Sequence, residues 1–167
     1  LPGANTYTGA TTISAGTLAI DGTGLLGAGN YSGNIAINGL TSAFLYNGTN
    51  NQTLSGIISG NGSFTKNNTG TLTISGANTY TSTTTVNNGT LTLGAADRIA
   101  DTSDLNVAGG TFNLAGFNET LGSITGAGNI TLGAGTLTTN STSNTTFSGI
   151  ISGTGGLTKN GTGVLTL

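Results

Sequence analysis

Polar and apolar residues alternate along most of this chain in short runs of four. Clear examples are Thr71-Leu-Thr-Ile74, Thr90-Leu-Thr-Leu93 and Asn129-Ile-Thr-Leu132. Alternation with a period of two places Leu and Ile on one face of a β-strand and Thr or Asn on the other. Asn-Gly, Ala-Gly and Gly-Thr-Gly sequences, which form turns, separate the runs. The pattern predicts many short strands, and a single helical turn is expected only within 95–104.

Short strands at near-regular spacing are compatible with a sandwich, a barrel or a β-helix. We favour an all-β, right-handed parallel β-helix of about seven or eight coils, each of roughly 20–24 residues. Many of the turns resemble corners rather than hairpins, and the polar positions carry Thr and Asn instead of charges. Like charges stacked every ~4.8 Å would repel one another, whereas Thr and Asn hydrogen-bond to their copies in the next coil.

One long motif recurs in the chain, and its second copy is divided between the two termini. The complete copy spans 55–93; its first half returns at 148–167 and its second half stands at 1–20. Lys66 and Lys159 are 93 residues apart, whereas Tyr7 and Tyr80 are 73 apart, so an insertion of about one coil separates the copies. We interpret 1–167 as a single module, one period or fragment of a longer or head-to-tail array.

Composition narrows the possible functions. Charged residues make up 5% of the chain, the net charge is −2, and Lys66, Arg98 and Lys159 lie far apart, which argues against nucleic-acid binding. The chain lacks Cys, Met, Trp and His, so disulfides and the usual transition-metal ligands are absent. No apolar run reaches the length of a membrane-spanning helix. We assign no catalytic residue, no metal ligand and no cofactor.

The motif also resembles a known family. Gly60-Asn-Gly-Ser-Phe-Thr-Lys66-Asn-Asn-Thr-Gly-Thr-Leu-Thr-Ile74, followed by Ser75-Gly-Ala-Asn-Thr-Tyr80-Thr, is similar to the autotransporter-associated β-strand repeat, also called the passenger-associated transport repeat. Order and spacing match over 60–93, and 153–167 with 1–20 supply the second copy. The resemblance implies a right-handed parallel β-helix in a secreted or surface-displayed bacterial protein, with a parent protein anchored in the outer membrane.

The charged residues are the first candidates for a site. Asp97, Arg98, Asp101 and Asp104 cluster in sequence, while Asp21 and Glu119 stand apart. Paired carboxylates serve as acid and base in enzymes that cut polysaccharides. The simpler interpretation is a solvated loop with a local Asp–Arg pair, because no second charged group is placed to converge with it. Calcium binding is weakly indicated, since the glycine-aspartate nonapeptide of calcium-binding β-rolls is missing.

Three other features have a structural and a functional interpretation. The pairs Thr71/Thr73, Thr90/Thr92 and Thr136/Thr138 would form a hydroxyl ladder of the ice-binding kind, or simply reflect strand propensity. The aromatic residues would stack on sugars in a groove, or pack in the core, which we favour; they are Tyr7, Tyr31, Phe44, Tyr46, Phe64, Tyr80, Phe112, Phe117 and Phe147. For Lys66 and Lys159 we expect a structural role, covering a turn or bonding corner carbonyl groups.

The sequence therefore predicts a non-enzymatic, extracellular stalk or filament segment of a bacterial surface protein. Its expected partners are copies of itself stacked head to tail, because residues 148–167 followed by 1–20 restore the motif. The alternative is an adhesin or glycan-binding module that recognises cell-surface glycans. A polysaccharide-active enzyme and an ice-binding protein are the remaining alternatives.

Overall fold

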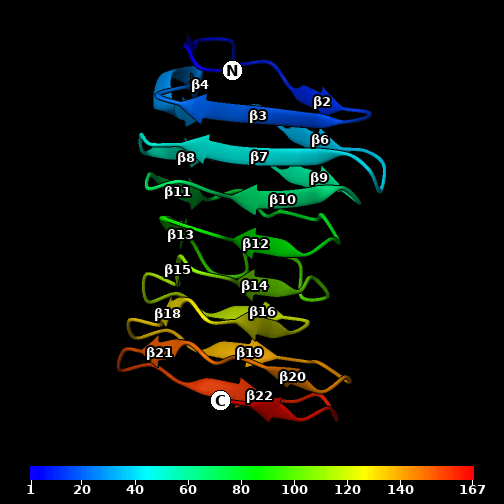
Figure 1. The fold of residues 1–167 in the computed structure, drawn as a ribbon, viewed down its shortest axis with the longest axis vertical. Helices are drawn as coiled ribbons and strands as arrows, with labels where there is room; N and C mark the ends of the chain where they lie inside the picture. The colour runs from blue at the N-terminus through cyan, green and yellow to red at the C-terminus, as the bar shows by residue number, and fades with distance from the viewer.

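A computed structural model describes residues 1–167 as a parallel β-solenoid of about 8 turns. Its coils stack along one axis, with the two termini at opposite ends (Figure 1). This confirms the predicted fold class, at the upper end of the expected number of coils. No helix of the structure has the length and hydropathy needed to cross a membrane.

The strands lie on three faces of the solenoid, which we number in chain order starting from β2. The first face holds β2 (Thr11–Ile13), β6 (Ile35–Ile37), β9 (Ile58–Gly60), β16 (Glu119–Leu121), β19 (Leu137–Thr139) and β22 (Leu157–Lys159). The second holds β3 (Thr17–Gly22), β7 (Ala43–Gly48), β10 (Ser63–Lys66), β12 (Thr84–Val86), β14 (Leu105–Val107), β17 (Ile124–Gly126), β20 (Thr145–Thr146) and β23 (Leu165–Thr166). The third holds β1 (Ala4–Asn5), β4 (Leu25–Leu26), β5 (Asn30–Tyr31), β8 (Gln52–Leu54), β11 (Thr71–Ile74), β13 (Thr90–Leu93), β15 (Thr111–Asn113), β18 (Asn129–Thr131) and β21 (Ile150–Ser152).

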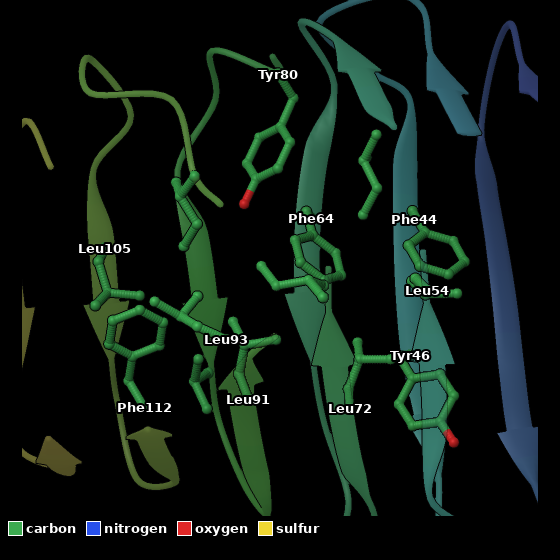
Figure 2. Packing of buried hydrophobic residues seen from close by; sticks show 14 of the residues in the cluster. Phe44, Tyr46, Leu54, Phe64, Leu72, Tyr80, Leu91, Leu93, Leu105 and Phe112 are labelled. Atoms are coloured by element: carbon green, nitrogen blue, oxygen red, sulfur yellow. The ribbon is translucent and has the colours of Figure 1, made fainter. Parts of the chain in front are cut away.

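The apolar half of the alternating pattern forms one continuous core. Twenty-eight buried hydrophobic residues make a single cluster. Aromatic rings pack against one another from coil to coil. On the second face the ring centres of Phe44 and Phe64 are 5.8 Å apart and the rings are stacked, and Tyr80 from the first face meets the Phe64 ring edge-on at 5.7 Å. Figure 2 shows these rings beside the leucines of the third face, including Leu72 and Leu91. Because every coil contributes to the same column, burial of apolar surface stabilises the whole stack.

Coil length varies because the corners differ in length while the strands keep their register. Paired positions in neighbouring coils are 26 residues apart at Leu18 and Phe44, but only 18 apart at Glu119 and Leu137. Glycine is needed at the tightest corners. A Cβ atom on Gly149 would lie 1.7 Å from the carbonyl oxygen of Gly128 in the previous coil, closer than any real contact.

The first face is interrupted between β9 and β16. No strand forms at 78–81 or 97–101, and two polar side chains make hydrogen bonds to the backbone there. The Asn78 amide accepts from the Ile58 N–H and donates to the Arg98 carbonyl, while the Glu119 carboxylate accepts from the N–H groups of Arg98 and Ile99. The side chains thus take the place of a missing strand pairing.

The prediction of a helical turn within 95–104 is wrong. The segment consists of bends and a turn, and Asp97 has a φ of 53°, which a right-handed helix does not allow. Its backbone is instead hydrogen-bonded to the next coil through the carboxylate of Glu119. One short 3₁₀ helix, η1 (Gly27–Gly29), occurs elsewhere, at a corner that the sequence pattern did not single out.

The two copies of the motif occupy different faces of the solenoid. Lys66 ends β10 on the second face, whereas its counterpart Lys159 ends β22 on the first. Residues 17–20 likewise lie on the second face in β3, whereas their counterparts 90–93 lie on the third in β13. Both half-copies are therefore displaced by one face, in the same direction, relative to the complete motif.

Candidate functional site: a polar hollow at one corner

A solvent-open hollow of about 520 Å³ lies at the corner between the first and second faces, over three successive coils. It results from unequal corner lengths. Only Gly122 and Ser123 separate β16 from β17, whereas 140–144 separate β19 from β20 in the next coil. The previous coil contributes the corner 101–104. The short middle corner is recessed relative to the two longer corners on either side of it, and the hollow is the space above the short corner.

The hollow is lined by ten residues, none of them hydrophobic. They are Asp101, Thr102, Asp104, Gly122, Ser123, Asn140, Ser141, Thr142, Ser143 and Thr145. Hydrogen bonds fix part of this lining. The Ser123 hydroxyl donates to Asp104 Oδ1 at 2.6 Å, and Ser141 Oγ donates to the Ser143 carbonyl while accepting from its N–H. The site is thus a pre-formed, hydrophilic surface.

The structure divides the charged cluster that the sequence singled out. Asp101 and Asp104 line the hollow, but Asp97 and Arg98 do not. The Arg98 guanidinium donates instead to the carbonyl groups of Ala96 and Ser75. The local Asp–Arg ion pair that the simpler interpretation expected does not form, because the guanidinium covers carbonyl groups.

The two remaining carboxylates lie outside the hollow. Asp21 lies in β3 near the other end of the solenoid, where its Oδ1 accepts a hydrogen bond from the Asn47 amide at 2.8 Å. Glu119 is directed inward and is 1% exposed. No three potential metal-ligating side chains of the chain gather in one place.

Glu119 is a buried carboxyl group with no cationic partner. Burial raises its pKa from the ordinary 4.5 to about 7, although the N–H groups of Arg98 and Ile99 favour the charged form. The nearby charges of Asp97 and Asp101 raise the pKa further. Because it bonds only to backbone groups, its geometry is that of a structural bridge across the interrupted face.

The expected structural role of the repeated lysines holds for Lys66. Its side chain is fully buried, and Nζ donates to the carbonyl groups of Asn67, Asn68 and Asn88, the last from the next coil. Nζ also lies 5.5 Å from the centre of the Tyr46 ring. Burial lowers the pKa of Lys66 to about 8. Lys159 is exposed and donates to the Gly161 carbonyl within its own corner.

Most of the aromatic residues lie in the core, as expected, which leaves few for ligand stacking. The exceptions are Tyr7, 40% exposed, and Phe117, 38% exposed. Tyr7 packs edge-on against the buried Tyr31 ring at 5.5 Å, and burial raises the pKa of Tyr31. Neither exposed ring lines the polar hollow.

A short hydroxyl ladder of Thr120, Thr138 and Thr158 forms on the first face, and the longest one lies on the third. One residue per coil points outward in register, in the order Thr53, Thr73, Thr92, Asn113, Thr131 and Ser152. Thr138 lies on the first face in β19 and is separate from this ladder. The expected coil-to-coil bonding is found for asparagine, since the Asn87 amide donates to the Asn67 side chain at 2.7 Å. The threonine hydroxyls of the ladder make no hydrogen bond to one another.

The residues that complete the hollow were not identified from the sequence. Ser123 and the segment 140–145 supply more than half of its lining. A signal was present: Thr139-Asn-Ser-Thr-Ser-Asn144 is a long run of turn-forming polar residues. What the sequence did not show is that the neighbouring coil turns within two residues, which is the cause of the hollow.

Comparisons with known proteins agree on the kind of repeat. The model of a family described as the passenger-associated-transport-repeat matches residues 1–20 and 64–93. An "Adhesin BmaC autotransporter" of Brucella suis biovar 1 (strain 1330) is 36% identical to the chain over 183 residues, which cover 92% of the chain. The chain spans about 5% of the length of that adhesin. No solved structure matches the chain.

Proposed function

Since this chain is a passenger-associated transport repeat protein located at the bacterial cell surface or outside the cell, we propose that it is a rigid, non-enzymatic spacer segment of a surface-displayed passenger. The observation that supports this most directly is the continuity of the sheets. Six and seven strands, respectively, pair in parallel along the second and third faces without a break. A chain stacked in this way has no hinge, and it holds whatever is attached to it at a fixed distance.

The mechanism of such a spacer is coil-to-coil bonding. Backbone hydrogen bonds cross between coils on all three faces, and no buried polar side-chain atom lacks a partner. In solenoids each repeat contacts only its neighbours, so length is added one coil at a time. Eight turns at about 4.8 Å per turn give a length of about 38 Å. The parent protein would be anchored in the outer membrane, with this segment outside.

Stacking on a copy of itself extends the proposal to a partner. The strand β23 ends the chain on the second face, and β1 begins it on the third. A copy of residues 1–20 laid after residues 148–167 therefore continues the winding in the correct order of faces. It would also cover the inward-facing Leu157 and Leu165 of the last coil, which are only partly buried, and Leu167, which is 70% exposed. Because the half-copies share one displacement, the joined motif would be continuous.

A direct tandem fusion tests the spacer and the stacking together. Two copies joined from Leu167 to Leu1 without a linker should scatter X-rays as one rod of about 77 Å, twice the single length. A matched control starts the second copy at Thr11, which removes β1 and displaces the winding by one face; it should give two bodies joined by a flexible connection. Two separate bodies in the direct fusion would contradict the proposal, and so would equal continuity in the control.

The second candidate function is adhesion. It is supported by the related adhesin autotransporter, because the similarity to that protein covers 92% of the chain. Polystyrene beads coated with the purified chain should then bind to epithelial cells more than beads coated with a heat-denatured sample. Equal binding of both bead types would contradict an adhesive role, while leaving the spacer role to the scattering measurement.

A further inference from the structure

The polar hollow is shaped for a small ligand, although its lining differs from that of most such pockets. Its volume of about 520 Å³ falls within the range of about 300–1,000 Å³ that is typical of ligand pockets. Those pockets are lined mostly by hydrophobic and aromatic side chains, whereas this one has no hydrophobic residue. An apolar ligand would gain nothing here. The lining suits a ligand that carries hydroxyl or amine groups over much of its surface.

Unused hydrogen-bonding groups face this space. The amide of Asn140 and the hydroxyls of Thr102, Thr142 and Thr145 line the hollow and make no hydrogen bond within the chain. Asp101 is also free of hydrogen bonds, and Asp104 uses only Oδ1, with Ser123. The site therefore offers donors and acceptors together, as a polyhydroxylated ligand requires. Part of the lining is already held in place, which reduces the entropy lost on binding.

Charge restricts the ligand further. Asp101 and Asp104 line the hollow, and no Lys or Arg does. An acidic ligand would meet two carboxylates with no cation to balance them, which disfavours sialylated or uronic saccharides and phosphates. A calcium ion fits the geometry poorly. It takes six to eight oxygen ligands at about 2.3–2.6 Å, whereas this hollow is far larger than one ion and has only two carboxylates.

We propose that the hollow formed by the corners 101–104, 122–123 and 140–145 is a binding site for a neutral or amino-substituted saccharide. The carboxylates of Asp101 and Asp104 accept from sugar hydroxyl or ammonium groups. Asn140 and the threonine hydroxyls bond the remaining edge of the ring. The inference rests on the adhesive candidate function and gives it a ligand class, whereas the spacer role does not depend on it.

The test is a binding titration of the purified chain with saccharides of different charge, followed by NMR spectroscopy. The neutral probes are chitotriose and maltotriose, the cationic probe is the glucosamine trisaccharide, and the acidic probes are sialyllactose and a hyaluronan tetrasaccharide. We expect a neutral or cationic probe to bind and to shift the amide signals of 101–104 and 140–145. The acidic probes should bind at least about tenfold more weakly, because each lacks a cationic partner in the site.

Variants locate the binding. The double variant Asp101→Asn with Asp104→Asn removes both charges and should weaken binding at least about tenfold, since hydrogen bonds to charged groups are the stronger kind. Thr142→Trp places a large ring on an exposed position of the lining and should block the site by bulk. Asp97→Asn is the matched control, because it removes a carboxylate from the same segment but outside the hollow. It should leave the affinity unchanged.

Several results would overturn the assignment. One is that none of the neutral and cationic probes binds, and another is that the acidic probes bind more tightly than these. A third is that calcium shifts the same amide signals when no saccharide does. The last is that the Thr142→Trp variant binds a saccharide with the same affinity as the wild type. The Trp variant keeps the test decisive if the double variant fails to fold, because Thr142 is exposed and its side chain makes no hydrogen bond. Failure of binding would leave the rod length of the tandem fusion unaffected, so the two proposals can be separated.

Discussion

The buried carboxyl group of Glu119 makes the stability of the chain depend on pH in an unusual direction. Its pKa is about 7 in the folded chain and close to 4.5 when the chain is unfolded. Between these values the folded state holds a proton that the unfolded state has released, so folding becomes less favourable as the pH rises. The stabilisation is complete below about pH 4.5 and is lost as the pH passes through about 7.

The size of the effect follows from the two pKa values. A tenfold change in an acid dissociation constant corresponds to about 1.4 kcal/mol. The difference between the two pKa values therefore lowers the free energy of unfolding by about 3 kcal/mol once the pH is above both. For a chain of this length about 1 kcal/mol moves the midpoint of thermal unfolding by roughly 2–4 °C. We therefore expect the midpoint to fall by about 10 °C between pH 4.5 and pH 8.

Thermal unfolding followed by circular dichroism, at intervals of half a pH unit, measures this slope. The chain contains no histidine, the residue whose charge ordinarily changes between pH 5 and 8. Lys66, with a pKa of about 8, begins to lose its proton at the upper end of this range in the wild type and in the variant alike, so the difference between the two slopes isolates Glu119. Glu119→Gln removes the titration and keeps one acceptor for the N–H groups of Arg98 and Ile99. The variant should be nearly independent of pH over the same range. A wild-type slope equal to that of the variant would refute the reasoning, because it would mean that burial does not hold the proton.

The remaining predictions concern packing and bonding between coils. Gly149→Ala should destabilise the chain by about 1–3 kcal/mol, because the added Cβ meets the backbone of the previous coil, whereas Gly9→Ala meets nothing within 4 Å and should be neutral. Lys66→Met should cost about 1–3 kcal/mol in urea unfolding, since three corner carbonyl groups lose a buried donor; the exposed Lys159→Met should cost much less. Phe64→Ala should cost about 3–5 kcal/mol, because it opens a cavity between the stacked Phe44 ring and the edge-on Tyr80 ring.

Each of these predictions can fail separately. Equal midpoints for the two glycine variants would mean that the corners relax freely. A Lys66 variant as stable as the Lys159 variant would show that water replaces the buried ammonium group. A loss below about 1 kcal/mol for the phenylalanine would indicate that the neighbouring rings close the cavity.

The strands could be predicted closely because their signal is local. The sequences Thr71–Ile74 and Thr90–Leu93 form strands with those same bounds, and their alternating residues point inward and outward as expected. The interruption of the first face could not be predicted from propensity. Asn78 and Glu119 bond the backbone of other coils, and a pattern of single residues does not show which distant N–H group lies opposite.

The candidate site was predictable only in part, for a related reason. Asp101 and Asp104 stood out by their charge, which is rare in this chain. Their partners in the hollow, such as Ser123 and Asn140, are of types that occur throughout the sequence. The hollow depends on the difference in length between adjacent corners, and that difference becomes visible only once the register of the coils is known.

The displacement of the motif copies by one face has a consequence for how a long array of such repeats meets its surroundings. Lys66 and Lys159 belong to the same sequence motif but end strands on different sides of the solenoid. Because the two copies are offset in this way, their equivalent outward-facing positions lie on different sides of the solenoid. A fibre assembled from such repeats would therefore offer an equivalent position on more than one side, and it would not need one particular orientation to meet a flat target.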